Sequence, residues 1–360
     1  MRIEPHDLNL NGLLDLLHDR YLLDAAGLTF VPQGIDSWSY IATCNDGSRA
    51  FVKLTRPEPT GATTSEMPLM AALVARGLPV PRPIADLDGA FASTLDGYDV
   101  HVLEYIAGRT LEDESDWPDD LYAGVARIVA AVHMATRDVR SLLWRAEDYA
   151  LPFLPAFETT LATFEADSFP PDGEEPIVGL RELIAPRVPQ LRATIDRLRQ
   201  LRDLASVRRS EAVLCHTDIW GSNLLLSPGG TLHLLDWGGA LIGPPESDLF
   251  MFAGTTFFPS GRFGWFLDQY EAAFRLVRLE ADTFGFYLYK RNLEDLAGFV
   301  AAIGAGRTEA MALDAALSIV ADLLDETGPI ADQIEGVREI LVARRGIVRR
   351  NFGPRAATRG

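Results

Sequence analysis

The chain opens with apolar residues at helical spacing and then changes to short apolar stretches separated by turn residues. Leucines recur every three or four positions in residues 9–24, which predicts an amphipathic helix. After Gly27 the apolar stretches are rich in β-branched and aromatic residues, which favours strands, and Asn45-Asp46-Gly47 is a hairpin-turn sequence. The predicted strands are residues 28–34, 37–45 and 49–54.

A helix and two more strands complete this β-rich part. Residues 65–77 predict the helix, since Pro68 is tolerated in a first turn. Residues 78–84 predict an extended connection, and residues 88–106 predict two strands around a turn at Asp96-Gly97. We therefore expect five strands and one helix between about residues 28 and 107.

Beyond residue 107 the pattern is mainly helical. Residues 119–136 have a strong apolar face, and 178–206 and 260 onward also predict helices. A linker rich in proline, acidic and aromatic residues is expected at about 148–177. Residues 224–237 predict a hairpin that turns at 227–230.

This order predicts an α+β fold with two lobes. A small nucleotide-binding lobe is expected at 1–105, with a five-stranded sheet plus helix, and a larger α-rich lobe at 106–345. Residues 346–360 form a basic end that we expect to be a flexible tail.

Composition and charge exclude several classes of partner. The net charge of −18 disfavours nucleic acid and anionic membranes, because both need cationic contacts. No apolar run approaches the roughly 20 residues of a membrane helix, and the N-terminus lacks a signal-peptide pattern, so a cytoplasmic protein is expected. Cys44 and Cys215 are expected to be free thiols. We expect a monomer, with a homodimer left open.

Lysine is scarce in this chain. Of 33 lysine and arginine residues, only Lys53 and Lys290 are lysines. A sequence that uses arginine almost everywhere has retained a lysine in Phe51-Val52-Lys53-Leu54, which indicates a site that needs a compact ammonium group.

Residues 214–226, LCHTDIWGSNLLL, concentrate polar chemistry immediately before a predicted strand. A closed zinc site usually needs four ligands, and no second Cys/His pair accompanies Cys215 and His216. A serine hydrolase of the G-x-S-x-G type is disfavoured because that pattern is absent here. Phosphoryl transfer remains, since it needs a carboxylate near the acceptor hydroxyl, oxygen ligands for Mg²⁺ and a cation on the phosphates.

The spacing of three polar residues fits phosphoryl transfer. Asp218 and Asn223 are five positions apart, and Asp236 follows one predicted hairpin later. A tight hairpin returns Asp236 close to Asn223, and their oxygens suit Mg²⁺. Asp218 is then free to act as the base.

These motifs resemble those of the protein-kinase-like antibiotic phosphotransferases, and are most similar to the aminoglycoside class. The resemblance rests on His216-x-Asp218-x-x-x-x-Asn223, on Leu235-Asp236-Trp237 and on Pro244-x-x-x-Asp248, and it extends over about residues 25 to 310. It implies a bilobal protein-kinase-like fold, with ATP and Mg²⁺ as cofactors.

The resemblance implies a role for each catalytic position. Asp218 would position the acceptor hydroxyl, and Asn223 and Asp236 would be the Mg²⁺ ligands. His216 would support the catalytic loop and Asp248 would brace it.

The same resemblance implies a nucleotide site in the small lobe. Lys53 would contact the α- and β-phosphates, with Glu66 as its partner. The backbone of Glu104, Tyr105 and Ile106 would contact adenine, and Ser37 and Ser39 would line the phosphate loop. That loop, residues 33–40, departs from the family pattern because it has one glycine instead of three, and Trp-Gly-Gly follows Asp236 where relatives often carry another acid.

The acceptor is expected between the catalytic loop and the late helices. Tyr287, Arg291, Glu294 and Asp295 fall within two turns of one predicted helix, and the two acids could bind a protonated amine. The alternative is a local salt-bridge face that these acids form with Lys290 and Arg291.

We expect an enzyme that phosphorylates a hydroxyl of an aminoglycoside- or aminocyclitol-type antibiotic, a cationic small molecule. Choline, homoserine, a sugar or a nucleoside antibiotic remain alternative acceptors. A pseudokinase that only binds nucleotide is the alternative outside enzymes.

Overall fold

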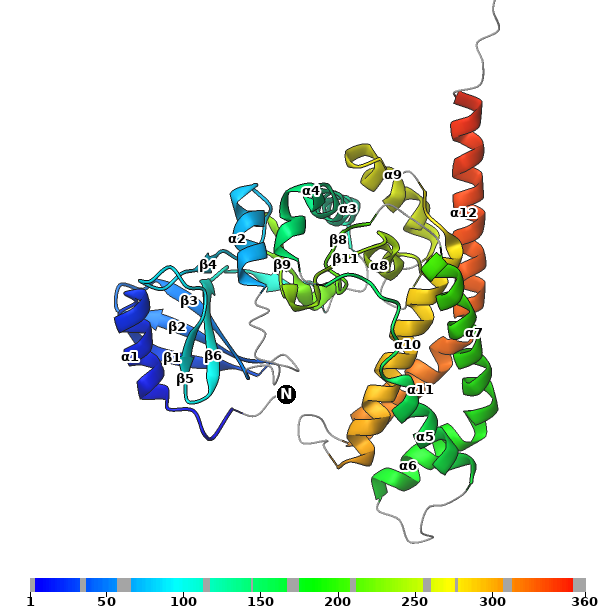
Figure 1. The fold of residues 1–360 in the computed structure, drawn as a ribbon, viewed down its shortest axis with the longest axis horizontal. Coiled ribbons are helices and arrows are strands. Elements are labelled where there is room, and N and C mark those ends of the chain that lie inside the picture. Colours follow the sequence, from blue (N-terminus) through cyan, green and yellow to red (C-terminus); the bar gives the residue numbers. More distant parts are fainter. Residues whose placement is uncertain are drawn as a thin grey trace, which may run out of the picture.

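The computed structural model describes residues 4–32, 37–56, 66–112, 117–143, 145–166, 175–207, 212–254, 260–275, 278–306 and 313–351. Strands gather in the N-terminal part of the chain and helices in the C-terminal part, as the ribbon in Figure 1 shows. The predicted α+β class is confirmed.

An antiparallel sheet, whose strands differ in length, forms the N-terminal region. Its order is β1-β2-β3-β6-β4, and β5 pairs with β6 beside this path. The strands are β1 (Ala25–Val31), β2 (Trp38–Cys44), β3 (Arg49–Thr55), β4 (Pro83–Ile84), β5 (Ser93–Leu95) and β6 (Tyr98–Glu104).

One face of this sheet is covered by helix α1 (Leu10–Tyr21), which the sequence predicted (Figure 1). Asn9 caps the helix by accepting the backbone N–H of Gly12 at 3.0 Å. Leu13 and Leu17 are fully buried against alternate residues of the strands, among them Tyr40 and Val52. The period-two pattern of the strands therefore forms a separate small core with α1.

Within the described residues the sheet has six strands, one more than predicted. The extra strand, β4, lies in the predicted extended connection, where Pro83 pairs with Leu103 and Ile84 with Val102. A two-residue strand that begins with proline has no periodicity to recognise in the sequence, and it forms because the chain passes along the free side of β6. Helix α2 (Met67–Ala75) precedes it and packs on the larger core.

The C-terminal region is built around helix α10 (Ala281–Gly304), which packs against α7, α11 and α12. Its residues Phe284, Phe286 and Leu293 are fully buried. The other helices are α3 (Asp119–Met134), α4 (Thr136–Val139), α5 (Leu154–Glu165), α6 (Glu175–Ile184), α7 (Val188–Val207), α8 (Glu246–Leu249), α9 (Phe263–Ala273), α11 (Leu313–Thr327) and α12 (Ile330–Asn351). Short 3-10 helices are η1 (Arg140–Leu142), η2 (Ala185–Arg187), η3 (Gly221–Asn223), η4 (Trp237–Gly239), η5 (Phe250–Phe252) and η6 (Ser260–Arg262).

Two predictions for this region were wrong in part. The expected linker at 148–177 contains α5, whose Phe157 and Leu161 are buried in the core. The expected flexible tail begins too early, because α12 continues to Asn351, and residues 352–360 lie outside the described part. The first error comes from composition outweighing periodicity, since proline-rich flanks do not prevent a helix whose apolar face has a surface to pack on.

Short strands carry the residues predicted for catalysis. The predicted hairpin is confirmed as β9 (Leu224–Leu226) and β10 (Leu232–Leu234), and β7 (Arg109–Thr110) pairs with β9. Beside it, β8 (Val213–Cys215) pairs with β11 (Leu241–Gly243). Gly108 precedes β7 where a Cβ atom would lie 2.6 Å from the carbonyl oxygen of Leu226, so only glycine allows this close approach.

Among the described residues, no helix is both long and apolar enough to cross a membrane.

Candidate active site

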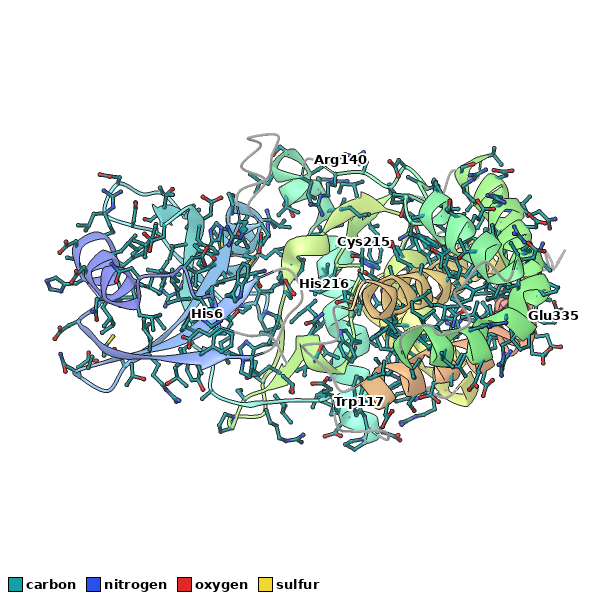
Figure 2. The ribbon with its side chains drawn as sticks, turned by 90° about the horizontal axis from the view of Figure 1, so that it is seen from below. His6, Trp117, Arg140, Cys215, His216 and Glu335 are labelled. Carbon is teal, nitrogen blue, oxygen red and sulfur yellow. The ribbon has the colours of Figure 1, made fainter. Side chains whose placement is uncertain are left out.

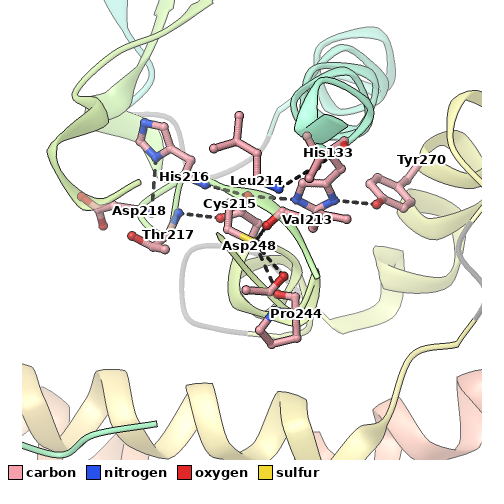
Figure 3. Close-up of polar contacts among 12 residues, drawn as sticks. His133, Val213, Leu214, Cys215, His216, Thr217, Asp218, Pro244, Asp248 and Tyr270 are labelled. Carbon is pink, nitrogen blue, oxygen red and sulfur yellow. Dashed lines mark hydrogen bonds and ion pairs between the residues drawn. The ribbon is translucent and has the colours of Figure 1, made fainter. Parts of the chain in front are cut away.

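The predicted catalytic segment leaves β8 at the middle of the molecule, where the β-rich and helical regions meet (Figure 2). Thr217 there has a φ of 74°, which is unfavourable for a β-branched residue. The backbone N–H groups of His216 and Thr217 donate to the two carboxylate oxygens of Asp248, at 3.0 and 2.6 Å (Figure 3). Thr217 Oγ1 also donates to the carbonyl of Gly239 at 3.1 Å. These bonds hold the strained turn that begins the loop.

Asp248 is itself held by His133, which is held in turn by Tyr270. His133 Nε2, on α3, donates to Asp248 Oδ2 at 3.0 Å, and His133 Nδ1 bonds Tyr270 Oη, on α9, at 2.6 Å (Figure 3). The side chains of His133 and Asp248 are completely buried. With the His133 proton on Nε2, the buried carboxylate has donors on both oxygens.

His216 connects the loop to the end of the hairpin. Its Nε2 donates to the carbonyl of Leu235 at 2.7 Å, and its Nδ1 accepts the backbone N–H of Asp218 at 3.3 Å. The ring meets the ring of Trp237 edge-on, with 4.8 Å between centroids. This geometry agrees with the supporting role predicted for His216, which stays a prediction.

Asp218 is held through both carboxylate oxygens. Asn223 Nδ2 donates to Asp218 Oδ2 at 2.8 Å and to its backbone carbonyl at 2.9 Å. Arg291 Nη1, on α10, donates to Asp218 Oδ1 at 2.9 Å. The carboxylate is thus oriented by neighbours on the loop and on α10, and it remains about one-third exposed, at 33%.

Asn223 and Asp236 offer oxygens suitable for Mg²⁺. The backbone carbonyl of Asn223 accepts the N–H of Leu235 at 2.8 Å, which brings the end of the hairpin next to Asn223. Because the amide nitrogen of Asn223 serves Asp218, its Oδ1 remains the atom available to a cation. The side chain of Asp236 is 59% exposed, so it can accept a further ligand. The donor set therefore fits a hard cation that keeps several waters.

Lys53 links the two regions. Its Nζ lies 3.1 Å from Glu66 Oε1, at the start of α2, and 3.1 Å from Asp236 Oδ1. Burial disfavours the ammonium, but Glu66 and Asp236 outweigh it and raise the pKa of Lys53. Burial likewise opposes ionisation of Asp236, yet Lys53 lowers the pKa of that carboxyl below its ordinary value. Lys53 and Asp236 are therefore both charged at neutral pH.

The structure places some of the residues predicted to contact the nucleotide near Lys53. Ser39 is buried on β2 directly opposite Lys53 in register, and Ser37 precedes this strand. The rest of the expected phosphate loop, residues 33–36, lies outside the described residues.

The segment predicted to contact adenine, Glu104 to Ile106, has fewer free backbone groups than predicted. The N–H of Glu104 donates to the carbonyl of Arg82 at 2.8 Å, so this amide is not available to adenine. The guanidinium of Arg49 lies over the ring of Tyr105, with 4.0 Å between Arg49 Cζ and the ring centroid. The contacts predicted for Ile106 and for the remaining backbone groups of Glu104 and Tyr105 stay predictions.

The predicted acceptor residues form mainly local ion pairs. Lys290 bonds Glu294 at 3.0 Å, and Arg291 Nε bonds Asp295 at 2.7 Å, which is the salt-bridge face that the sequence left open as an alternative. Tyr287 is buried and donates to Glu147 Oε2 at 2.8 Å, so its hydroxyl is not presented to an acceptor. No pattern in the sequence indicated the contact between Arg291 and Asp218, which are 73 positions apart.

Both cysteines are free, as predicted, and both are buried. Burial raises the pKa of the Cys215 thiol well above its ordinary value, so it is not a nucleophile at neutral pH. The fold does bring potential ligand atoms of His133, Cys215 and Asp248 within 4.8 Å of one another. The hydrogen bonds of His133 and Asp248 already account for this cluster without an ion.

Comparison with known proteins identifies the fold. A family model described as the phosphotransferase enzyme family matches residues 27–285. A solved spectinomycin phosphotransferase, in complex with ADP and spectinomycin, is similar with a TM-score of 0.75 at 15% identity, over 91% of this chain and 99% of that one.

Two further solved structures share this fold. An amicoumacin kinase, in complex with AMP-PNP, Ca²⁺ and its ligand, has a TM-score of 0.60 at 17% identity, over 88% of this chain and 92% of that one. A choline kinase from Streptococcus pneumoniae has a TM-score of 0.54 at 18% identity, over 88% and 98%. At these identities the likeness establishes a shared fold.

Proposed function

The chain belongs to the phosphotransferase enzyme family, and from this premise we propose that it transfers the γ-phosphoryl group of ATP to a hydroxyl of an aminoglycoside- or aminocyclitol-type antibiotic such as spectinomycin. The observation that carries the proposal is the convergence of Lys53 with Asp236, and of Asn223 with Asp218, at one place. These four residues supply the phosphate cation, two cation ligands and the base that such a transfer needs.

In the proposed reaction, Asp218 accepts a hydrogen bond from the acceptor hydroxyl and takes its proton as the transfer proceeds. A bond forms between the hydroxyl oxygen and the γ-phosphorus, the bond from the γ-phosphorus to the β,γ-bridging oxygen breaks, and ADP leaves with that electron pair. Asn223 Oδ1 and Asp236 would hold Mg²⁺, which when bound neutralises phosphate charge. Since the transition state is loose, positioning of these groups matters more than the basicity of Asp218.

The choice of acceptor is supported by the similarity to a solved phosphotransferase and by the net charge of the chain. The spectinomycin phosphotransferase resembles this chain over nearly its whole length. The chain also carries a net charge of −18, which attracts a cationic antibiotic. Because Glu294 and Asp295 are engaged by Lys290 and Arg291, they support a cationic acceptor less than the sequence suggested.

An ATP-consumption assay over a panel of acceptors tests this proposal. The panel contains aminocyclitols, aminoglycosides, nucleoside antibiotics and small amino alcohols, with the buffer alone as blank. We expect ATP consumption and a phosphorylated product with spectinomycin or another aminocyclitol. Turnover only with choline or another amino alcohol would indicate the alternative small-molecule kinase, and ATP binding without turnover on any acceptor would indicate the pseudokinase.

Replacing Lys53 by methionine is expected to weaken MgATP binding by about 10- to 100-fold, since a charge-assisted bond to phosphate is lost. Methionine keeps most of the buried stem, so the fold should be retained. Titration calorimetry with a non-hydrolysable ATP analogue measures the change.

Lys290→Met is the matched control, because Lys290 is the chain's other lysine and pairs with Glu294 on α10. Its nucleotide affinity should equal that of the unsubstituted protein. An equal loss in both variants, or none in Lys53→Met, would remove Lys53 from the phosphate site.

A further inference from the structure

Helix α10 brings a guanidinium into the site. Arg291 donates from Nη1 to Asp218 Oδ1 at 2.9 Å and from Nε to Asp295 Oδ2 at 2.7 Å. Asp295 lies one turn further along α10, so it can hold the guanidinium in place. Burial disfavours the charge of Arg291, but Asp295 and Asp218 more than compensate and raise its pKa, so the guanidinium stays protonated.

The catalytic segment itself contains no comparable cation. From residue 211 to residue 261 the sequence has neither lysine nor arginine, although this stretch includes Asp218, Asp236 and Asp248. In the described part of the chain, the lysine or arginine hydrogen-bonded to Asp236 is Lys53 and the one bonded to Asp218 is Arg291. A cation beside the base therefore comes from α10.

The local packing explains why Gly239, in the loop after Asp236, carries no side chain. A Cβ atom on Gly239 would lie 2.6 Å from Thr217 Oγ1 and 3.3 Å from the carbonyl of His216. A longer side chain at this position would displace the strained turn that starts the catalytic loop. The cation beside Asp218 comes instead from α10, a helix that contacts α8.

Arg291 has donors beyond the two in use. A guanidinium carries five N–H groups in a planar fork, a geometry that matches phosphate oxygens. In the described structure two of its nitrogens serve Asp218 and Asp295, and the side chain is 39% exposed. The group is thus fixed in orientation while part of it still faces solvent next to the base.

We propose that Arg291 is a catalytic residue that binds an oxygen of the phosphoryl group during transfer, while its bond to Asp218 orients the base. Negative charge in this transition state spreads over three equatorial oxygens, so a fixed cation at the acceptor side stabilises it more than the ground state. Arg291 stays protonated throughout, and the hydroxyl proton goes to Asp218. The inference rests on the proposed phosphoryl transfer, and it needs no particular acceptor.

Binding of MgADP with tetrafluoroaluminate, which mimics the phosphoryl group in transfer, tests the inference without an acceptor. We expect Arg291→Ala to bind MgADP within about twofold of the unsubstituted protein and to bind MgADP–tetrafluoroaluminate about 10²-fold more weakly, the usual cost of one lost transition-state donor. With an acceptor that is turned over, kcat should fall by a similar factor while both KM values change little. Added guanidinium should restore part of the lost kcat, and Arg291→Lys should lie between the two.

Arg338→Ala is the matched control, because Arg338 forms a similar fork with Asp282 and Glu335 on the surface of α12 and α10. It should behave like the unsubstituted protein, and thermal unfolding shows that both variants are folded. Equal weakening of MgADP with and without tetrafluoroaluminate would overturn the inference, as would an unsubstituted protein that gains nothing from tetrafluoroaluminate. A raised acceptor KM with unchanged kcat would instead make Arg291 an acceptor-binding residue. If tetrafluoroaluminate binding depends on Arg291 but no panel acceptor is phosphorylated, the proposed antibiotic acceptor fails and the role of Arg291 stands.

Discussion

Asp218→Asn is expected to lower kcat by about 10³-fold, or ~4 kcal/mol in the activation barrier, because the amide cannot take the proton of the acceptor hydroxyl. The side chain keeps its size, and its carbonyl oxygen can still accept from either Asn223 or Arg291, which now bond the two carboxylate oxygens. Nucleotide binding should therefore change little. Steady-state kinetics with the best acceptor of the panel, together with calorimetric nucleotide titration, measures both quantities.

The control for this substitution is Asp325→Asn. Asp325 is 74% exposed and pairs with Arg187 on the surface, away from the catalytic segment. Its kcat should match that of the unsubstituted protein. A folded, nucleotide-binding Asp218→Asn variant that keeps most of its turnover would show that another group takes the proton.

Asp248→Ala is expected to lower the free energy of unfolding by about 3 to 5 kcal/mol, because buried donors lose their common acceptor. The N–H groups of His216 and Thr217 and the Nε2–H of His133 all donate to this fully buried carboxylate. Thr217 would then hold a φ of 74° without its main restraint, so the catalytic loop should also lose its geometry. Urea unfolding followed by circular dichroism gives the free energy.

An exposed acid again provides the comparison for stability. Asp325→Ala removes one solvent-exposed ion pair, whose contribution is within about 0.5 kcal/mol. If Asp248→Ala is no less stable than Asp325→Ala, then Asp248 does not brace the loop. If it is destabilised but fully active at a temperature where it stays folded, the brace is structural and does not position Asp218.

Much of the fold could be predicted because its elements depend on local periodicity. Residues 9–24 and 119–136 form helices near their predicted limits, since each has an apolar stripe wide enough to pack. β4 and α5 were missed because two residues cannot show a period, and because proline and acidic flanks hid an apolar face. Such elements are decided by the surface on which they pack.

In the candidate site, too, contacts that are local in the sequence could be predicted and contacts between distant elements could not. The spacing of Asp218, Asn223 and Asp236 was informative because these residues lie on one short loop and one tight hairpin, whose geometry is local. The pairing of Lys53 with Glu66 followed from a strand and the next helix, and the distance of 3.1 Å agrees with it. Tyr287 was predicted for the acceptor but is buried against Glu147, because helical spacing does not tell which side of a fully packed helix faces a neighbour.

By itself the sequence determined the two-region α+β organisation, the polar motif after β8 and the lysine of β3, since each depends on residue types at short spacing. Only the tertiary structure decided which distant groups meet this motif. His133, Tyr270 and Arg291 come from three separate helices, and no pattern within any of these helices indicates its partner. The packing of the helical core places them, because the position of one helix against another is set by the whole buried surface and not by the polar residues it carries into contact.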